Sequence, residues 1–137
     1  MPAPRSPHLA LTILAVADVA RAARFYAAAF GWKQTFDGSP HYAEFMLGNG
    51  TGIGLYVHRG FAGQVGADVA ELPPGTVTGT ELYVRVDDLD SAIAALVAAG
   101  ARPLSPRARR VWGEEAAYFA DPDGHVVAVA KVLDEHD

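Results

Sequence analysis

The sequence predicts an α+β fold made of two tandem βαβββ units. Three observations predict it: a composition typical of one compact domain, an internal repeat about seventy residues long, and strands that alternate apolar and polar side chains. Half of the 137 residues are hydrophobic and 20% are charged, and a chain of this size can fold without disulfides. Because the chain has no cysteine, thiolate metal sites and a cysteine nucleophile are excluded.

The repeat is clearest in two amphipathic helices. Apolar residues recur at helical spacing from Val19 to Phe30, after Asp18, and the same pattern returns seventy residues later, after Asp88. Each aspartate is placed to accept hydrogen bonds from the first turn of its helix, and a glycine follows each helix. The spacing therefore predicts one helix in each half of the chain.

Strands with alternating side chains surround these helices. Residues 11–16 and 81–86 precede them, and each helix is followed by further strands and a tight hairpin. The hairpin residues Phe45 and Phe119 are seventy-four positions apart, so the second unit holds four extra residues, which we assign to the connection 105–112. The predicted organisation is an N-terminal tail over 1–8, units over 9–58 and 80–132, a linker over 59–79 and an acidic tail over 133–137.

The charge distribution limits the partners. A net charge of −5 argues against nucleic acid and anionic membranes. Arg107, Arg109 and Arg110 form the one basic cluster, and we interpret it as a solvated turn because two glutamates follow closely. No apolar stretch approaches the roughly 20 residues of a membrane span, and the first residues lack the apolar core of a signal peptide. We therefore expect a cytoplasmic protein.

Two phrases carry a family resemblance. VADVARAARFYAAAFGW in the first half and YFADPDGHVVAVA in the second resemble the vicinal oxygen chelate superfamily, and the resemblance covers residues 9–132. This superfamily includes glyoxalase I, extradiol dioxygenases, fosfomycin-modifying enzymes and bleomycin resistance proteins. The resemblance implies that the uncovered faces of the two sheets curl around a shared cavity. The cavity could form within one chain or between two chains, and we expect a homodimer.

The resemblance also implies where a metal would be held. In metal-dependent members, four ligands come from the first and last strands of the two units, and the motifs place them at Leu11, Gly54, Glu81 and Ala128. Only Glu81 can bind a cation, whereas a catalytic transition metal needs about three protein ligands. The sequence therefore predicts neither a metal nor another cofactor. We expect His125, in the DPDG turn phrase, to be structural.

The side chains that point into the cavity follow from strand alternation. In the strand after Thr80, Leu82 and Val84 face the helix, so their neighbours face the cavity. The same argument, together with the expected rim, predicts ligand contacts from Tyr42, Met46, Tyr56, Tyr83, Arg85, Trp112 and Tyr118. Glu44, Glu81 and His58 are the acid/base candidates, and Phe36 and Phe61 are further candidates for the rim.

Three functions fit these residues. The first is a metal-free protein, similar to bleomycin and other antibiotic resistance proteins, that sequesters an aromatic or amphipathic compound. The second is a glyoxalase-like lyase or isomerase in which Glu81, Glu44 or His58 transfers protons, since burial among tyrosines would raise a carboxyl pKa toward neutrality. The third is an enzyme whose metal is held at non-standard places such as His41, His58 and Glu81.

Overall fold

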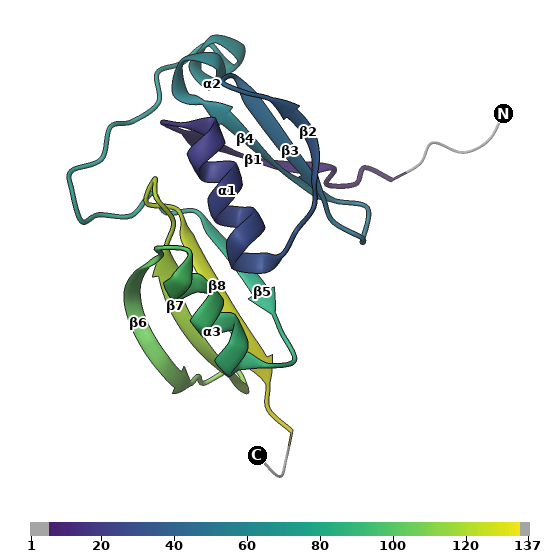
Figure 1. The fold of residues 1–137 in the computed structure, drawn as a ribbon, viewed down its shortest axis with the longest axis vertical. Helices are drawn as coiled ribbons and strands as arrows, with labels where there is room; N and C mark the ends of the chain where they lie inside the picture. Colours follow the sequence, from purple (N-terminus) through teal and green to yellow (C-terminus); the bar gives the residue numbers. More distant parts are fainter. Residues whose placement is uncertain (1–5, 135–137) are drawn as a thin grey trace, which may run out of the picture.

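The structure is a computed structural model that describes residues 6–134; the outer parts of the two predicted tails, 1–5 and 135–137, lie outside it. The elements follow the predicted order with one added helix (Figure 1): β1 Leu11–Val16, α1 Val19–Phe30, β2 Gln34–Gly38, β3 Tyr42–Met46, β4 Gly52–Val57, α2 His58–Val65, β5 Glu81–Arg85, α3 Leu89–Ala98, β6 Arg102–Arg109, β7 Glu114–Ala120 and β8 Val126–Val132.

The strands form two separate sheets of four, in the orders β1-β4-β3-β2 and β5-β8-β7-β6. In each sheet the first strand pairs in parallel with the last, and the remaining pairs are antiparallel. In the first hairpin Glu44 lies opposite Gly54 and Phe45 opposite Ile53, which is the predicted register. The two βαβββ units are therefore confirmed.

Both predicted helices begin at their capping aspartates. Asp18 accepts a hydrogen bond from the Arg21 N–H at 3.0 Å, and Asp88 accepts one from the Ser91 N–H at 3.1 Å. These carboxylates satisfy N–H groups that have no partner inside a helix. Helix α1 ends at Gly31, whose φ of 69° is the left-handed conformation that glycine adopts most readily.

Two segments differ from the prediction. The linker expected over 59–79 begins with α2, and strand β4 ends at Val57, so His58 is the first residue of a helix rather than a strand residue facing a cavity. The basic cluster is not a solvated turn: Arg107 and Arg109 lie in β6, and Arg107 pairs with carboxylates of α3 and β7. Two register irregularities in β6 accommodate extra residues of the second unit as bulges.

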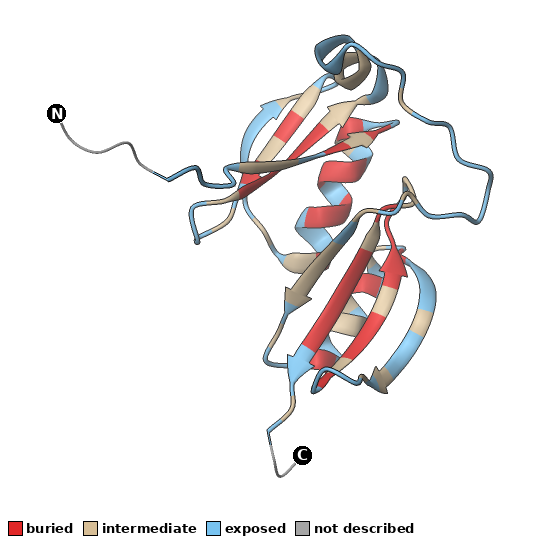
Figure 2. Ribbon diagram, turned by 180° about the vertical axis from the view of Figure 1, so that it is seen from behind, coloured by how far each residue is buried: buried red, intermediate tan, exposed pale blue. Residues whose placement is uncertain are grey.

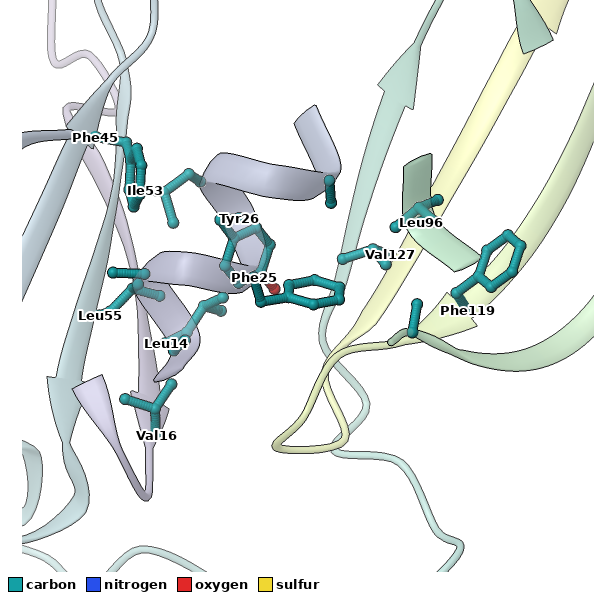
Figure 3. Packing of buried hydrophobic residues seen from close by; sticks show 14 of the residues in the cluster. Leu14, Val16, Phe25, Tyr26, Phe45, Ile53, Leu55, Leu96, Phe119 and Val127 are labelled. Carbon is teal, nitrogen blue, oxygen red and sulfur yellow. The ribbon is translucent and has the colours of Figure 1, made fainter. Parts of the chain in front are cut away.

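The hydrophobic core lies between the two units. Helices α1 and α3 pack against each other, and α1 also packs on β3 and β4. One cluster of buried side chains joins Phe45 and Leu55 of the first sheet, Phe25 of α1, Leu96 of α3 and Val127 of the second sheet (Figure 3). Each sheet thus has one face covered by a helix and one bare face, and both bare faces are seen from behind in Figure 2.

The turn between β7 and β8 docks on the first unit through polar contacts. The Tyr26 hydroxyl of α1 donates to Asp121 Oδ2 at 2.6 Å, and the Ala17 N–H donates to Asp123 Oδ1 at 2.8 Å. His125 is buried, and its Nε2 lies 2.8 Å from the Ala15 carbonyl. Because a carbonyl can only accept, Nε2 carries the proton. These contacts give His125 the structural setting that we expected.

Candidate functional site

The bare face of the first sheet gathers most of the predicted ligand contacts of the first unit. We call it the first bare face; its side chains come from Ile13 of β1, Phe36 of β2, Tyr42, Glu44 and Met46 of β3, and Gly54 and Tyr56 of β4. Strand alternation places all of them on one side, whereas Leu14, Phe45 and Leu55 point to the core. Strand alternation in the sequence predicted Tyr42, Glu44, Met46 and Tyr56 on this face, and the structure brings these four side chains together there.

Large side chains of this face lie over glycines. Tyr42 leans over Gly54, so closely that a Cβ at position 54 would overlap its hydroxyl. Three further side chains lie over glycines in the same manner: Phe36 over Gly38, Met46 over Gly52 and Tyr56 over Gly60. Because these positions lack a Cβ, the large side chains can lie down on the backbone instead of standing away from it. The result is a floor of rings and one thioether.

Helix α2 adds a wall to this floor. Phe61, Gln64 and Val65 of α2, with Ile13, Tyr42 and Tyr56, line a pocket of about 520 Å³. Tyr42 and Tyr56 meet edge to face, with ring centroids 5.4 Å apart. Sequence reasoning missed the α2 residues other than Phe61. The four-residue spacing of Phe61 and Val65, followed by the glycine that ends the helix, is the signal that could have found them.

One charged side chain of the first bare face, Glu44, lies next to this pocket through its contact with Tyr42. The Tyr42 hydroxyl donates to Glu44 Oε1 at 2.7 Å, and both side chains are half-buried. Burial, and then the hydrogen bond to Glu44, raise the pKa of Tyr42 well above its usual value. Tyr42 therefore stays protonated and holds the carboxylate of Glu44 in place.

The bare face of the second sheet, the second bare face, carries aromatic side chains together with arginines and a carboxylate. Trp112 donates from Nε1 to the Tyr83 hydroxyl at 2.9 Å, and Tyr118 lies beside Tyr83 across Ala128. Arg85 makes two hydrogen bonds to the buried carboxylate of Glu114, at 2.8 and 3.0 Å. The predicted contacts Tyr83, Arg85, Trp112 and Tyr118 thus share one face.

Two residues of the second bare face were not predicted as site residues. Arg110 stacks on Tyr118, with its guanidinium carbon 5.0 Å from the ring centroid, and Glu114 is the partner of Arg85. Arg110 directly follows β6 and Glu114 is the first residue of β7. The sequence had suggested a solvated turn in this region. Recognising β6 as a long bulged strand would have placed them on this face.

The three acid/base candidates do not form one group. Glu44 belongs to the first bare face, and Glu81 is exposed at the start of β5 in the other sheet. His58, at the start of α2, lines a neighbouring cavity of about 660 Å³ between β1, the linker and the β7–β8 turn. The structure thus gives no common centre for these side chains.

The four family places for metal ligands do not fit a metal ion. Leu11, Gly54 and Ala128 carry no ligating atom, and the Tyr42 hydroxyl takes the space into which a side chain at position 54 would extend. Among residues 6–134 no three His, Cys, Asp or Glu side chains are grouped to hold a metal. The donor chemistry of this chain therefore disagrees with the metal-dependent pattern.

Two βαβββ units, each with one helix-covered and one bare face, define a member of the vicinal oxygen chelate superfamily. Comparison with known families assigns the chain to one family within this superfamily. The family described as "Glyoxalase-like domain" matches residues 11–130, and the chain belongs to it. No helix within the described residues is long and apolar enough to cross a membrane.

Individual relatives agree with this family. A "glyoxalase-related enzyme" of known structure from Fulvimarina pelagi is 28% identical, with a TM-score of 0.79 over 90% of this chain and 87% of that one. A "glyoxalase/ bleomycin resistance protein/ dioxygenase" from Nocardioides shares the fold, with 22% identity and a TM-score of 0.76 over 97% and 88% of the two chains. "Putative glyoxylase CFP32" of Mycobacterium bovis is 28% identical over 85% of this chain, which spans only 42% of that protein.

Proposed function

We propose that this protein binds a planar or amphipathic organic molecule on its bare faces without altering it, as the metal-free bleomycin-resistance branch of the superfamily does. The observation that supports it most is the floor of Phe36, Tyr42, Met46 and Tyr56, each lying over a glycine, with its rings inclined to one another. Planar and amphipathic ligands gain contact area against such rings, and aromatic walls with few polar anchors are typical of small-molecule sites.

A second copy of the chain completes the site in this proposal. Both bare faces lie on the outside of the molecule (Figure 2). They carry exposed large side chains, among them Phe36 and Trp112, each 52% exposed. Exposed apolar patches of this kind mark interaction surfaces. A homodimer in which the second bare face of one copy lies opposite the first bare face of the other would enclose the ligand between aromatic walls.

The glyoxalase-like lyase or isomerase is the alternative function. It requires an acid and a base at one bound substrate. Within one chain, Glu44, Glu81 and His58 lie on three different elements, so this function depends on a partner subunit that brings Glu81 of one copy to Glu44 of the other. The binding function needs no such pairing of acid and base.

Binding of the neutral planar probe 2-naphthol tests the proposal. We expect saturable amide shifts of first-bare-face residues in NMR spectra and a rise in Tm by mass action. Tyr56→Ala should weaken binding by about 1–3 kcal/mol through lost stacking and contact area. Val97→Ala, which shortens an exposed side chain of α3, is the matched control and should leave Kd unchanged.

Two outcomes would contradict the proposal. Amide shifts confined to residues outside both bare faces would place the ligand elsewhere. Chemical conversion of an added compound by the metal-free protein, lost by about 100-fold in Glu81→Gln, would favour the lyase or isomerase instead.

A further inference from the structure

Glu44 is a carboxylate without a cationic partner. Its side chain is half-buried on the first bare face, where the Tyr42 hydroxyl is its hydrogen-bond donor. Within residues 6–134, no Lys, Arg or His nitrogen lies within 4.0 Å of it. A partly desolvated carboxylate gains most from a charge-assisted hydrogen bond or an ion pair.

Aromatic rings surround this carboxylate at different angles. Phe36 lies on the neighbouring strand β2, directly across from Glu44, and its ring is 6.2 Å from that of Tyr42 at an interplanar angle of 43°. Tyr42 and Tyr56 meet at 71°. The face of an aromatic ring is electron-rich and attracts cations within about 6 Å of its centre, whereas the ring edge is positive.

On the second bare face, a carboxylate and a tyrosine ring are each paired with an arginine. There, Glu114 is neutralised by Arg85, and the ring of Tyr118 is covered by the guanidinium of Arg110. Both the carboxylate and the tyrosine ring thus have a cation supplied by the chain itself. On the first bare face the carboxylate and the tyrosine rings are present, but none of its side chains is cationic.

We propose that the first bare face recognises an organic ammonium group, with Glu44 as its counter-ion and the rings of Tyr42 and Tyr56 as its walls. The planar part of the same molecule lies over the pocket against Phe61 of α2. This inference rests on the proposed binding function and narrows its ligand class to aromatic or amphipathic cations. Tyr42 acts as the positioning residue that holds the Glu44 carboxylate toward the ligand.

Three probes of similar size but different charge test this inference: benzylammonium, benzyl alcohol and phenylacetate. Affinities in the millimolar range are expected for molecules of this size and are measured by NMR titration of the full chain. We expect the cation to bind about 10-fold more tightly than the alcohol, and the anion to bind most weakly. The preference of the cation should decrease as salt is added.

Variants assign the preference to Glu44. Glu44→Gln keeps the shape and should weaken binding of the cation by about 10-fold while binding of the alcohol stays unchanged. Tyr42→Phe keeps the ring but removes the hydroxyl that holds Glu44. It should weaken binding of the cation less than Glu44→Gln does. Glu81→Gln tests the carboxylate of the second sheet separately. Asp90→Asn, which changes an exposed carboxylate of α3 outside both bare faces, is the matched control, and melting curves check that each variant is folded.

The outcomes separate this inference from the proposed function. Equal Kd values for the cation and the alcohol, both at the first bare face, would overturn the ammonium inference and leave the binding function standing. A cation preference that survives Glu44→Gln but disappears in Glu81→Gln would overturn the assignment to Glu44. No binding of any probe, and none of 2-naphthol, would overturn the proposed function itself.

Discussion

At the scale of single residues, the first bare face depends on glycines, which have no side chain. Gly54 lets Tyr42 lie flat, and the Tyr42 hydroxyl then reaches Glu44. A methyl group at position 54 would meet the far end of the Tyr42 side chain and not the backbone. Tyr42 can therefore yield by swinging away from the sheet, so the local surface changes while the core stays packed.

Gly54→Ala should for this reason separate ligand binding from stability. We expect affinity for 2-naphthol to fall by about 10-fold, since a displaced Tyr42 disrupts the floor, with the free energy of unfolding changed by less than about 1 kcal/mol. Gly63→Ala in α2 is the control, because a Cβ there meets nothing within 4 Å. It should leave Kd unchanged and stabilise the helix by up to about 1 kcal/mol. Undiminished affinity in Gly54→Ala would show that the floor is not the binding surface.

The sequence was sufficient to predict which side of a strand each of these residues faces. Period-two alternation assigned Tyr42 and Tyr83 to bare faces correctly, because the helix-facing positions are apolar throughout. Alternation carries no information about how a side chain leans along its face. The placement of Tyr42 over Gly54, and of Arg110 over Tyr118, depends on pairing between strands, which only the structure supplies.

At the scale of elements, the β7–β8 turn and helix α1 depend on each other. Asp121 accepts hydrogen bonds from the Tyr26 hydroxyl and from the N–H groups of Asp123 and His125. Burial raises the pKa of Asp121 above its usual value although these hydrogen bonds oppose the shift. A raised pKa in the folded state means that this carboxyl stabilises the fold below its unfolded pKa, and that this contribution is lost as pH rises through the folded pKa.

Tyr26→Phe should lower the free energy of unfolding by about 1–3 kcal/mol at neutral pH, because it leaves a buried carboxylate oxygen without its donor. The loss should be smaller near pH 4, where the carboxyl is partly protonated. Asp121→Asn retains an oxygen for the two N–H groups and should gain stability relative to wild type as pH rises from acidic to neutral. Urea denaturation across this pH range measures both effects.

Tyr118→Phe is the control for this pair, since no hydrogen bond of the Tyr118 hydroxyl is found within residues 6–134. It should change stability by less than about 0.5 kcal/mol at either pH. A loss in Tyr26→Phe that does not depend on pH would show that Asp121 is not the group responsible.

The sequence predicted the long elements well and the irregular ones poorly. Capping aspartates and a complete apolar stripe fixed α1 and α3, whereas α2 has only eight residues, two of them glycine in its interior, and no side-chain cap. Such a segment is a helix because it packs on β4 and β1, and this is a tertiary contact. The length of strand β6 was missed for a related reason: residues from 105 onward were assigned to a connection, because bulges break the period-two pattern and Pro103 and Pro106 indicate a loop.

At the scale of the whole molecule, the repeat predicts two equal units but not how they are placed. Their placement follows from the α1–α3 contact and from the docking of the β7–β8 turn, which join residues about a hundred positions apart such as Tyr26 and Asp121. No local pattern encodes these contacts. The consequence is that the core lies between the units, and both bare faces remain on the outside.

Exposed bare faces lead to the last prediction, which concerns assembly. A stable homodimer buries at least about 1,000 Å² in total, and the exposed apolar side chains of the two faces supply a suitable surface. We expect sedimentation at micromolar concentration to give twice the chain mass of 14.4 kDa. Ile13→Glu places a charge on the first bare face at a side chain that is 39% exposed, so it should dissociate the dimer while the monomer stays folded. Val97→Glu adds the same charge on α3, outside both faces, and should sediment as wild type. Wild-type protein that sediments as a folded monomer would show that the bare faces act alone, and the ligand would then bind to one open face instead of between two.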